Sequence, residues 1–334
     1  MSDQGRGGHT HRLCRHPREG PRLPGHGSPE PGPGNGGVTV VDDLVVAGSV
    51  AVVTGGASGI GRAISRALAT RGATVVIADI EAPVLEATVG ELAGLGDVEG
   101  VRTDVSDPAS VTALADHVFA DHGRCNLLFN NAGVTSGGGG LPWLQEFNDW
   151  LWCFGVNVFG VANGVSAFVP RMIDSGEPGQ VVNTSSGDGG FAPVPRASVY
   201  ASSKAAVSCF TEALHHNLVA EGTELRASVF YPSGGLMDTG LFTASRNRPE
   251  DLQRERGATG RSSMTFDEMK ARMEAAGLDV QVADLDELGH FVVDCASRRQ
   301  YVIARNLGGT IDLLHRRADA IGRMEVPPHH EIGF

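Results

Sequence analysis

The chain has little cysteine, little lysine and no long apolar run, and each shortage excludes a class of protein. Its five cysteines are odd in number and include no CxxC pair, so the sequence indicates neither a zinc site nor a disulfide framework. We therefore expect no bound metal and a reducing, cytoplasmic location. Because no apolar run approaches the ~20 residues that cross a bilayer, we expect no membrane partner.

Positive charge is also in the minority. The 27 Lys and Arg residues against 39 Asp and Glu give a formal net charge of −12, without the basic patch typical of nucleic-acid binders. Nucleic acid is therefore not an expected partner. An anionic nucleotide cofactor stays open, because a helix N-terminus can bind phosphate without net positive charge. Only Lys204 and Lys270 are lysines, which draws attention to the position of Lys204.

The first 37 residues contain ten glycines and six prolines and almost no apolar cluster. Such a segment cannot bury enough surface to offset the entropy lost on ordering. We expect a disordered, dispensable tail over residues 1–37, without the apolar core of a secretory signal. The length of 334 residues allows one large domain, or at most two.

From Ser49 onward, short apolar runs alternate with helical patterns. The expected strands are Ser49–Val53, Ala73–Ala78, Val101–Val105, Asn126–Phe129, Gln180–Thr184, Leu225–Tyr231 and Tyr301–Ala304. The expected helices are Gly59–Arg71, Pro83–Ala93, Asp107–His122, Asn148–Ser175, Ser198–Ala220 and Asp286–Ser297. Continuous apolar strands joined by helices predict a doubly wound, parallel α/β sheet of about seven strands. Ligands of such sheets bind beyond the carboxyl ends of the strands.

A glycine-rich turn, TGGASGIG (Thr54–Gly61), follows the first strand and opens the first helix. Glycines let the backbone approach a pyrophosphate, and the helix start presents free N–H groups to it. This pattern predicts a dinucleotide site that includes Gly55, Ser58, Gly59, Ile60 and Gly61.

Asp79 ends the second strand, 18 residues after Gly61, where a carboxylate can bind the adenosine ribose hydroxyls. It would repel the 2′-phosphate of NADP, and neither Ile80 nor Ser58 supplies a basic group nearby. The sequence therefore favours NAD. Small residues after the fourth strand, Asn131, Ala132 and Gly133, are further candidates to line the cofactor site.

Tyr200 and Lys204 lie four residues apart and share one face of an expected helix. Hydride transfer between an alcohol and a ketone needs a proton acceptor or donor, and a phenol with a pKa near 10 must be activated to serve. Lowering its pKa by ~3 units requires about 4 kcal/mol, which a cation at ~4 Å supplies at an effective dielectric constant near 20. Ser185 or Ser186 can polarise a carbonyl at a strand end, and Asn157 can hold a water that carries protons away.

These motifs together resemble the short-chain dehydrogenase/reductase family over about residues 45–305. The matching pieces are TGGASGIG, Asp104-Val105, NNAG (Asn130–Gly133), Trp150 seven before Asn157, NTSS (Asn183–Ser186) and YASSK (Tyr200–Lys204). The resemblance implies a catalytic set of Asn157, Ser186, Tyr200 and Lys204. It also implies that Asp104 and Val105 bind the adenine, and that Lys204, Pro232 and Thr239 contact the nicotinamide half.

The resemblance further implies a single Rossmann-like domain over residues 38–310, with a C-terminal extension over 311–334 and pairing into a homodimer or homotetramer. Two departures stand out. Ser186 precedes Tyr200 by 14 residues, one more than expected, which keeps Ser185 as an alternative. The usual Pro-Gly after the sixth strand reads Pro232-Ser233-Gly234-Gly235, and Gly308-Gly309 precedes an additional helical pattern over Ile311–Ala320.

Residues 236–280, named the lid segment below, are expected to cover the substrate. Leu236, Met237, Leu241 and Phe242 are candidate substrate contacts, and Thr265 with Glu268 predicts a capped helix over Phe266–Ala276. The charges between residues 240 and 260 are read as a solvated face. Trp143, Trp150 and Trp152 cluster before Asn157, which indicates either core packing or a site for an apolar or cyclic alcohol. Pairing between copies is expected through the face of the helix Ser198–Ala220 that carries Val199, Ala206, Phe210, Ala213 and Leu214.

The sequence thus predicts an NAD-dependent oxidoreductase that interconverts a secondary alcohol and its ketone. Two alternatives stay open at this point: an NADP-dependent ketoreductase or 3-oxoacyl reductase, and a non-catalytic NAD-binding scaffold.

Overall fold

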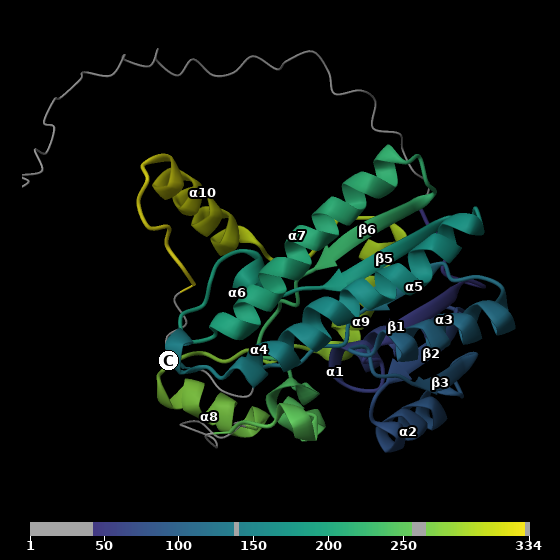
Figure 1. Cartoon of the computed structure of the whole chain (residues 1–334), viewed down its shortest axis with the longest axis horizontal. Coiled ribbons are helices and arrows are strands. Elements are labelled where there is room, and N and C mark those ends of the chain that lie inside the picture. Colours follow the sequence, from purple (N-terminus) through teal and green to yellow (C-terminus); the bar gives the residue numbers. More distant parts are fainter. Residues whose placement is uncertain (1–42, 137–139, 256–264, 331–334) are drawn as a thin grey trace, which may run out of the picture. The chain divides into compact units, whose positions relative to one another are not determined.

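The computed structural model describes residues 43–136, 140–255 and 265–330, and the expected tail over residues 1–37 lies outside them. Seven parallel strands form one sheet in the order β3-β2-β1-β4-β5-β6-β7 (Figure 1). The strands are β1 Val50–Thr54, β2 Thr74–Asp79, β3 Val98–Arg102, β4 Leu127–Asn130, β5 Gly179–Thr184, β6 Leu225–Phe230 and β7 Val302–Ile303. The order reverses between β1 and β4, so the carboxyl ends of these two strands border the crevice where ligands of such sheets bind.

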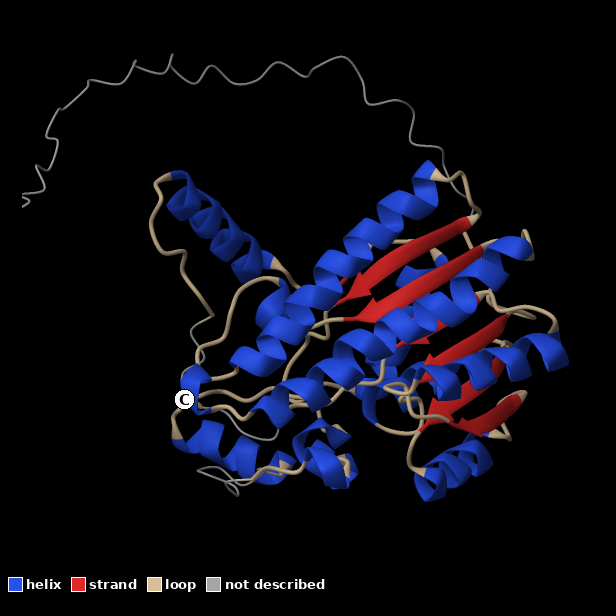
Figure 2. Ribbon diagram, in the orientation of Figure 1, coloured by secondary structure: helices blue, strands red, loops and turns tan. Residues whose placement is uncertain are grey.

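Helices cover both faces of the sheet (Figure 2). They are α1 Gly59–Thr70, α2 Ala82–Leu92, α3 Pro108–His122, α4 Phe147–Phe154, α5 Gly160–Asp174, α6 Gly187–Gly190, α7 Ser198–Ala220, α8 Phe266–Ala275, α9 Leu285–Ser297 and α10 Gly308–Gly322. Short helical turns lie at η1 Pro142–Leu144, η2 Gly155–Phe159, η3 Gly240–Asn247 and η4 Glu250–Leu252. The result is a single Rossmann-like α/β domain, as the alternating pattern predicts.

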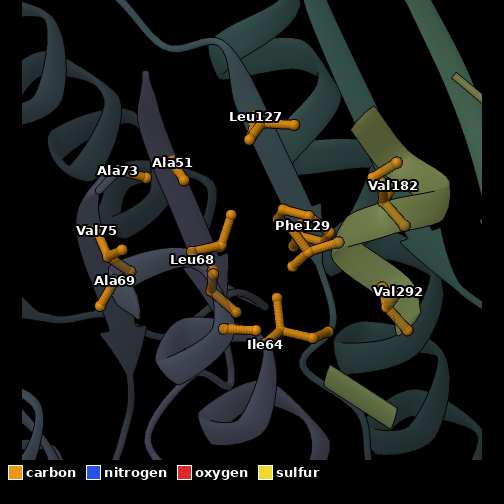
Figure 3. Close-up of a cluster of buried hydrophobic side chains, with 14 of the residues drawn as sticks. Ala51, Ile64, Leu68, Ala69, Ala73, Val75, Leu127, Phe129, Val182 and Val292 are labelled. Carbon is orange, nitrogen blue, oxygen red and sulfur yellow. The ribbon is translucent and has the colours of Figure 1, made fainter. Parts of the chain in front are cut away.

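Successive residues of the central strands point to opposite faces and enter two separate cores. On one face, Ala51 and Val53 of β1 pack with Ile64 and Leu68 of α1 and with Val292 of α9 (Figure 3). On the other face, the neighbouring strand residues pack against α3, α5 and α7. Burial on both faces explains why these strands appear in the sequence as continuous apolar runs.

The third strand is where the sequence-based boundaries were wrong. The structure places β3 at Val98–Arg102 rather than 101–105, and Asp104 and Val105 lie beyond its end. β3 is an edge strand with no fully buried residue, so it lacks the continuous apolar run that marks the inner strands. Gly100 lets it approach α2, because a Cβ there would lie 2.9 Å from Val89.

The long helix expected over 148–175 is divided by a π-helical turn, η2, between α4 and α5. The segment Phe147–Asp174 also meets the length and hydropathy criteria of a membrane span, unlike the sequence-based reading, although 44% of its most apolar window is buried inside the fold. A buried core helix of a soluble protein meets the same criteria, so this is weak support for a span.

Two other expectations need correction. Val199 of α7 is fully buried and cannot belong to a face that pairs with another copy, whereas Phe210 on the same helix is exposed. The additional C-terminal helix, α10, begins at Gly308, three residues before the expected start.

The lid segment enters and leaves the fold at one point. Leu236 donates its N–H to the Gln281 carbonyl at 2.8 Å, and Ala283 donates to the Leu236 carbonyl at 2.9 Å. Within the segment, Thr265 caps α8 in a reciprocal capping box with Glu268, as predicted. Residues 256–264 lie outside the described part of the chain.

Candidate active site

A cavity of about 700 Å³ opens at the carboxyl ends of the strands. With one exception, Asn157, every residue that the sequence nominated for the site lines it. These are Gly55, Ser58, Gly59, Ile60, Gly61, Asp79, Asp104, Val105, Asn131, Ala132, Gly133, Ser186, Tyr200, Lys204, Pro232 and Thr239. Residues separated by up to 184 positions in the chain thus meet at one edge of the sheet, as the position rule for parallel sheets predicts.

The glycine turn is packed too tightly for any side chain. A Cβ on Gly61 would lie 2.0 Å from the Gly55 carbonyl oxygen, and a Cβ on Gly55 would lie 2.8 Å from the Ala132 backbone. Gly59 has a φ of +51°, in the left-handed region that favours glycine. The start of α1 therefore presents bare backbone to the cavity, which fits the pyrophosphate of a dinucleotide.

Asp79 lies at the end of β2 and holds this turn in place. Its Oδ2 accepts the Ala57 N–H at 3.1 Å, and its Oδ1 accepts the Glu81 N–H at 3.1 Å. Burial raises the pKa of Asp79, and the two backbone N–H groups act in the opposite direction. The carboxylate is buried and also borders the cavity, where it suits a ribose.

Tyr200 and Lys204 lie on the first two turns of α7. The Lys204 Nζ lies 5.8 Å from the centre of the Tyr200 ring and donates a 2.9 Å hydrogen bond to the Thr184 carbonyl. Burial raises the pKa of the Tyr200 phenol, and a hydrogen bond with Ser186 acts against this rise. The direction is the opposite of the sequence-based expectation, because burial outweighs every favourable contact of the phenol.

The Lys204 ammonium is itself poorly solvated. Its burial lowers the pKa of Lys204 to about 8. Its hydrogen bond to the Thr184 carbonyl keeps it at the end of β5, inside the cavity wall. The ammonium thus lines the cavity beside Gly133.

The structure separates the two candidate serines. Ser186 caps the short helix α6, accepting the Asp188 N–H at 3.2 Å, and bonds with the Tyr200 phenol. The Ser185 hydroxyl instead donates to the Lys204 carbonyl at 2.8 Å and lies 2.7 Å from the Ser208 hydroxyl. The geometry therefore favours Ser186 as the residue that meets a substrate oxygen.

Asn157 lies in the π-helical turn η2, fully buried behind Gly133. Its Oδ1 accepts the Val134 N–H at 2.8 Å, and its Nδ2 donates to the Val134 carbonyl at 3.0 Å and to the Ser203 hydroxyl at 2.9 Å. A Cβ on Gly133 would lie 3.4 Å from both Asn157 Oδ1 and Lys204 Nζ. The backbone at Gly133 therefore lies close to both the lysine and the asparagine. π-helical turns often occur at functional sites.

Thr239 lies closer to the glycine turn than expected. A Cβ on Gly59 would lie 3.0 Å from the Thr239 Cβ, so the threonine contacts the turn at the start of α1. Its hydroxyl also accepts the Leu241 N–H at 3.4 Å and caps η3. Thr239 thus links the lid segment to the dinucleotide end of the cavity.

Apolar side chains of the lid segment form the remaining wall. The predicted contacts Leu236, Met237, Leu241 and Phe242 all line the cavity, and Met269 and Met273 of α8 join them. Of the three tryptophans, only Trp152 reaches the cavity. Trp143 is 75% exposed, and Trp150 packs against Phe154 instead.

Two arginines of the lid segment, Arg248 and Arg254, are not on a solvated face, and sequence analysis missed their role, whereas Glu250, Asp251 and Glu255 are exposed as predicted. Asp149 of α4, fully buried, accepts hydrogen bonds of 2.8 Å from both Arg248 and Arg254. Arg248 also lies over the Trp152 ring, 5.1 Å from its centre. Burial acts to raise the pKa of Asp149, but hydrogen bonds from Arg254 and Arg248 outweigh it and lower the pKa. The sequence around Asp149 does not predict these partners, because they lie 99 and 105 residues away in the chain.

A second contact ties the lid segment to the end of β2. Arg246 donates its Nε–H to Glu81 Oε2 at 3.0 Å and pairs through Nη2 with Glu81 Oε1. Asn247 donates to the same Oε1 at 2.8 Å.

The described residues include no group of His, Cys, Asp and Glu side chains arranged to hold a metal ion.

Three comparisons place this site among known proteins. The profile of the short chain dehydrogenase family matches residues 49–250. A 1-deoxy-11-beta-hydroxypentalenate dehydrogenase of Streptomyces avermitilis is 40% identical over 222 residues, which are 66% of this chain and 77% of that protein.

Solved structures agree with the sequence match. A short chain dehydrogenase/reductase from Burkholderia phymatum, in complex with NAD, superimposes with a TM-score of 0.76 at 36% identity and covers 86% of this chain and 99% of its own. A metagenomic short-chain oxidoreductase in complex with NADP gives a TM-score of 0.52 at 33% identity, covering 57% of this chain and 84% of its own.

The chain belongs to the short-chain dehydrogenase/reductase family. It is an NAD(P)-dependent oxidoreductase that acts on CH–OH groups of a small molecule.

Proposed function

We propose that the protein uses NAD to interconvert a secondary alcohol and its ketone, with Tyr200 as the acid and base. The observation that carries the proposal is the single cavity that joins a carboxylate at the ribose position, Asp79, to the cluster of Ser186, Tyr200 and Lys204. The two ends do different work: one fixes the dinucleotide, and the other handles a proton.

When bound, the nicotinamide would accept a hydride from the alcohol carbon or return one to the ketone. Tyr200 lies on the cavity wall, where its phenolic oxygen takes the alcohol proton in oxidation or delivers a proton to the ketone oxygen in reduction. The Ser186 hydroxyl, already bonded to that phenol, orients the same substrate oxygen. Oxidation thus converts alcohol and NAD⁺ into ketone, NADH and one proton.

The raised pKa of Tyr200 fits the acid role directly, because a phenol that keeps its proton can donate it. The base role needs nearby positive charge to stabilise the phenolate. Lys204 is the cation beside the ring, and an oxidised nicotinamide would add a second positive charge. Asn157 Oδ1 and Lys204 Nζ both lie 3.4 Å from the position of a Cβ on Gly133, and a water held by Asn157 would carry protons away from the ammonium.

The preference for NAD is supported by the carboxylate of Asp79, which would repel a 2′-phosphate. An NADP-dependent ketoreductase is the second candidate, and one observation favours it: Arg246 of the lid segment lines the cavity near Ser58. A non-catalytic scaffold is less well supported, because it does not need the cluster around Tyr200.

The substrate is proposed to be apolar, since Trp152, Phe242, Met269 and Met273 line the cavity. We also propose that copies of the chain pair through α7, where Phe210 remains exposed.

The first test is a fluorescence titration of the purified protein with NADH and with NADPH. Tighter binding of NADH supports the proposal, tighter binding of NADPH transfers it to the reductase alternative, and binding of neither points to the scaffold.

Tyr200→Phe tests the mechanism. Loss of proton transfer should lower kcat by on the order of 1000-fold while cofactor affinity changes less than about twofold. Tyr301→Phe is the matched control, because Tyr301 lies outside the cavity lining and packs on His215. Activity retained by Tyr200→Phe would remove Tyr200 from the mechanism.

A further inference from the structure

The proposed hydride and proton transfer does not use the ion pair of Glu81 and Arg246. This pair nevertheless lies at the adenosine end of the cavity. Both residues line the cavity together with Ser58, Asp79 and Ile80. Glu81 follows β2 by two residues, whereas Arg246 comes from η3 of the lid segment, 165 positions later. The fold therefore brings a guanidinium to a place where the local sequence supplies none.

The guanidinium lies close to the glycine turn. A Cβ on Gly240 would lie 3.0 Å from Arg246 Nη2 and 3.6 Å from the Ser58 hydroxyl. Gly240 thus lies between the two groups, and its missing side chain leaves the arginine beside the turn that receives the dinucleotide. Arg246 is fixed there, because Nη1 donates at 3.0 Å to the carbonyls of Gly240 and Thr243.

Glu81 occupies the Nε and Nη2 edge of the Arg246 guanidinium, where a bound anion would accept its hydrogen bonds. It accepts from both Nε and Nη2 of Arg246, which is the paired geometry that a phosphate monoester also uses. The hydrogen bond from Arg246 lowers the pKa of Glu81, with Asn247 assisting, so the carboxylate is charged at neutral pH. The arginine is therefore neutralised by a carboxylate that competes for the same N–H groups.

We propose that the Glu81–Arg246 pair is a specificity-determining element for the cofactor, in which Glu81 withholds the lid-segment guanidinium beside Ser58 from the 2′-phosphate of NADP. Asp79 and Glu81 then place two carboxylates beside the guanidinium of Arg246. A 2′-phosphate adds close to two more negative charges at pH 7 and meets a net negative site. NAD lacks that group and is not penalised. This inference rests on the proposed function, since it concerns the cofactor of the same reaction.

Glu81→Gln tests the proposal by removing one negative charge and keeping an amide oxygen that can hold Arg246 in place. The quantity measured is the ratio of the dissociation constants for NADPH and NADH, obtained by fluorescence titration of the full chain, so no substrate is needed. We expect the ratio to fall on the order of tenfold, which is about 1.4 kcal/mol in favour of NADPH.

Arg246→Met should move the same ratio in the opposite direction, because it leaves Glu81 charged and without its counter-charge near the phosphate position. The double variant Glu81→Gln with Arg246→Met should lose the gain in NADPH affinity, since the gain requires the arginine. Glu91→Gln is the matched control. Glu91 pairs with Arg62 and Arg66 away from the cavity lining, so it should leave the ratio within about twofold of its original value.

Three results would overturn the proposal: an unchanged ratio in Glu81→Gln, a gain that survives in the double variant, or an equal weakening of both cofactors in every variant. The last would mean that the pair only anchors the lid segment. Failure of the proposed function is distinguishable, because it shows in the unsubstituted protein, as tighter binding of NADPH or as activity retained by Tyr200→Phe. Whether or not the proposed function holds, the direction in which Glu81→Gln and Arg246→Met change the ratio tests the role of the Glu81–Arg246 pair.

Discussion

The two halves of the cavity are built in different ways. The dinucleotide half consists of backbone and small residues at the ends of β1, β2 and β4. Its glycines are packed so closely that an added Cβ would lie only 2.0–2.8 Å from neighbouring backbone atoms. The substrate half is a segment of the chain held against α4 and the residues after β2 by ion pairs between residues 99 to 165 positions apart. The first half depends on what side chains are absent, and the second depends on which side chains meet.

This difference predicts different responses to substitution. Adding a methyl group to a glycine of the dinucleotide half should weaken cofactor binding more than any change of charge does. Removing the buried charge of Asp149 should damage the lid segment while leaving the binding of NADH intact.

The largest effect is expected for Gly61→Ala. Its Cβ would lie 2.0 Å from the Gly55 carbonyl oxygen, so the turn must shift away from the phosphate position. Cofactor affinity should fall on the order of 1000-fold, about 4 kcal/mol, as measured by NADH titration. An affinity within tenfold of the original would show that the turn adapts and that the comparison between the two halves fails.

Asp149→Asn should break the other half. It leaves Arg248 and Arg254 without their buried counter-charge, and we expect the free energy of unfolding to fall by about 3 kcal/mol. kcat/KM should fall while the dissociation constant for NADH stays within about threefold. Asp116→Asn is the control, because Asp116 pairs with Arg171 at the surface and should cost less than about 1 kcal/mol. Equal losses in the two variants would contradict the anchoring role.

A pH titration of stability tests the burial of Lys204 without any cofactor. Its pKa is lowered from 10.5 to about 8, so between these values the unfolded chain holds a proton that the folded chain has lost. The contribution of Lys204 to stability is therefore most unfavourable below pH 8 and improves as the pH rises toward 10.5.

Between pH 7 and 9.5, the free energy of unfolding of the unsubstituted protein should gain about 2 kcal/mol relative to Lys204→Met. Chemical denaturation at several pH values measures the difference, and the comparison with the variant removes the effect of other groups. A constant difference across this range would mean that Lys204 is better solvated than its burial indicates.

The smallest effect is expected for a glycine outside the cavity, where an added methyl group has room. Gly90 lies in α2, and a Cβ there would meet nothing within 4 Å. Gly90→Ala should raise the free energy of unfolding by about 0.5–1 kcal/mol, because alanine favours the helix and restricts the unfolded chain. Thermal unfolding detects the change. A destabilised Gly90→Ala would show that the glycines of this chain are not distinguished by the contacts of their missing side chains.

Most of the dinucleotide half could be predicted from the sequence, because its signals are local. A glycine turn between a strand and a helix, and a Tyr and a Lys one helical turn apart, each occupy fewer than ten consecutive residues. The rule that parallel strands end at one edge then brings them together. The buried position of Asn157 behind Gly133 was not predicted, since it depends on the π-helical turn that rotates the residues of η2.

The sequence by itself determined the sheet, the glycine turn and the order of the residues around Tyr200, because hydrophobic periodicity and backbone conformation act over short distances. Only the tertiary structure decided three other points: that Ser186 rather than Ser185 meets Tyr200, that Asp149 holds two arginines of the lid segment, and that Arg246 reaches Glu81 beside the dinucleotide site. The physical reason is that an ion pair or a buried hydrogen bond needs only its two partners to be close in space. Nothing in the residues that flank either partner records which distant side chain the fold will bring to it.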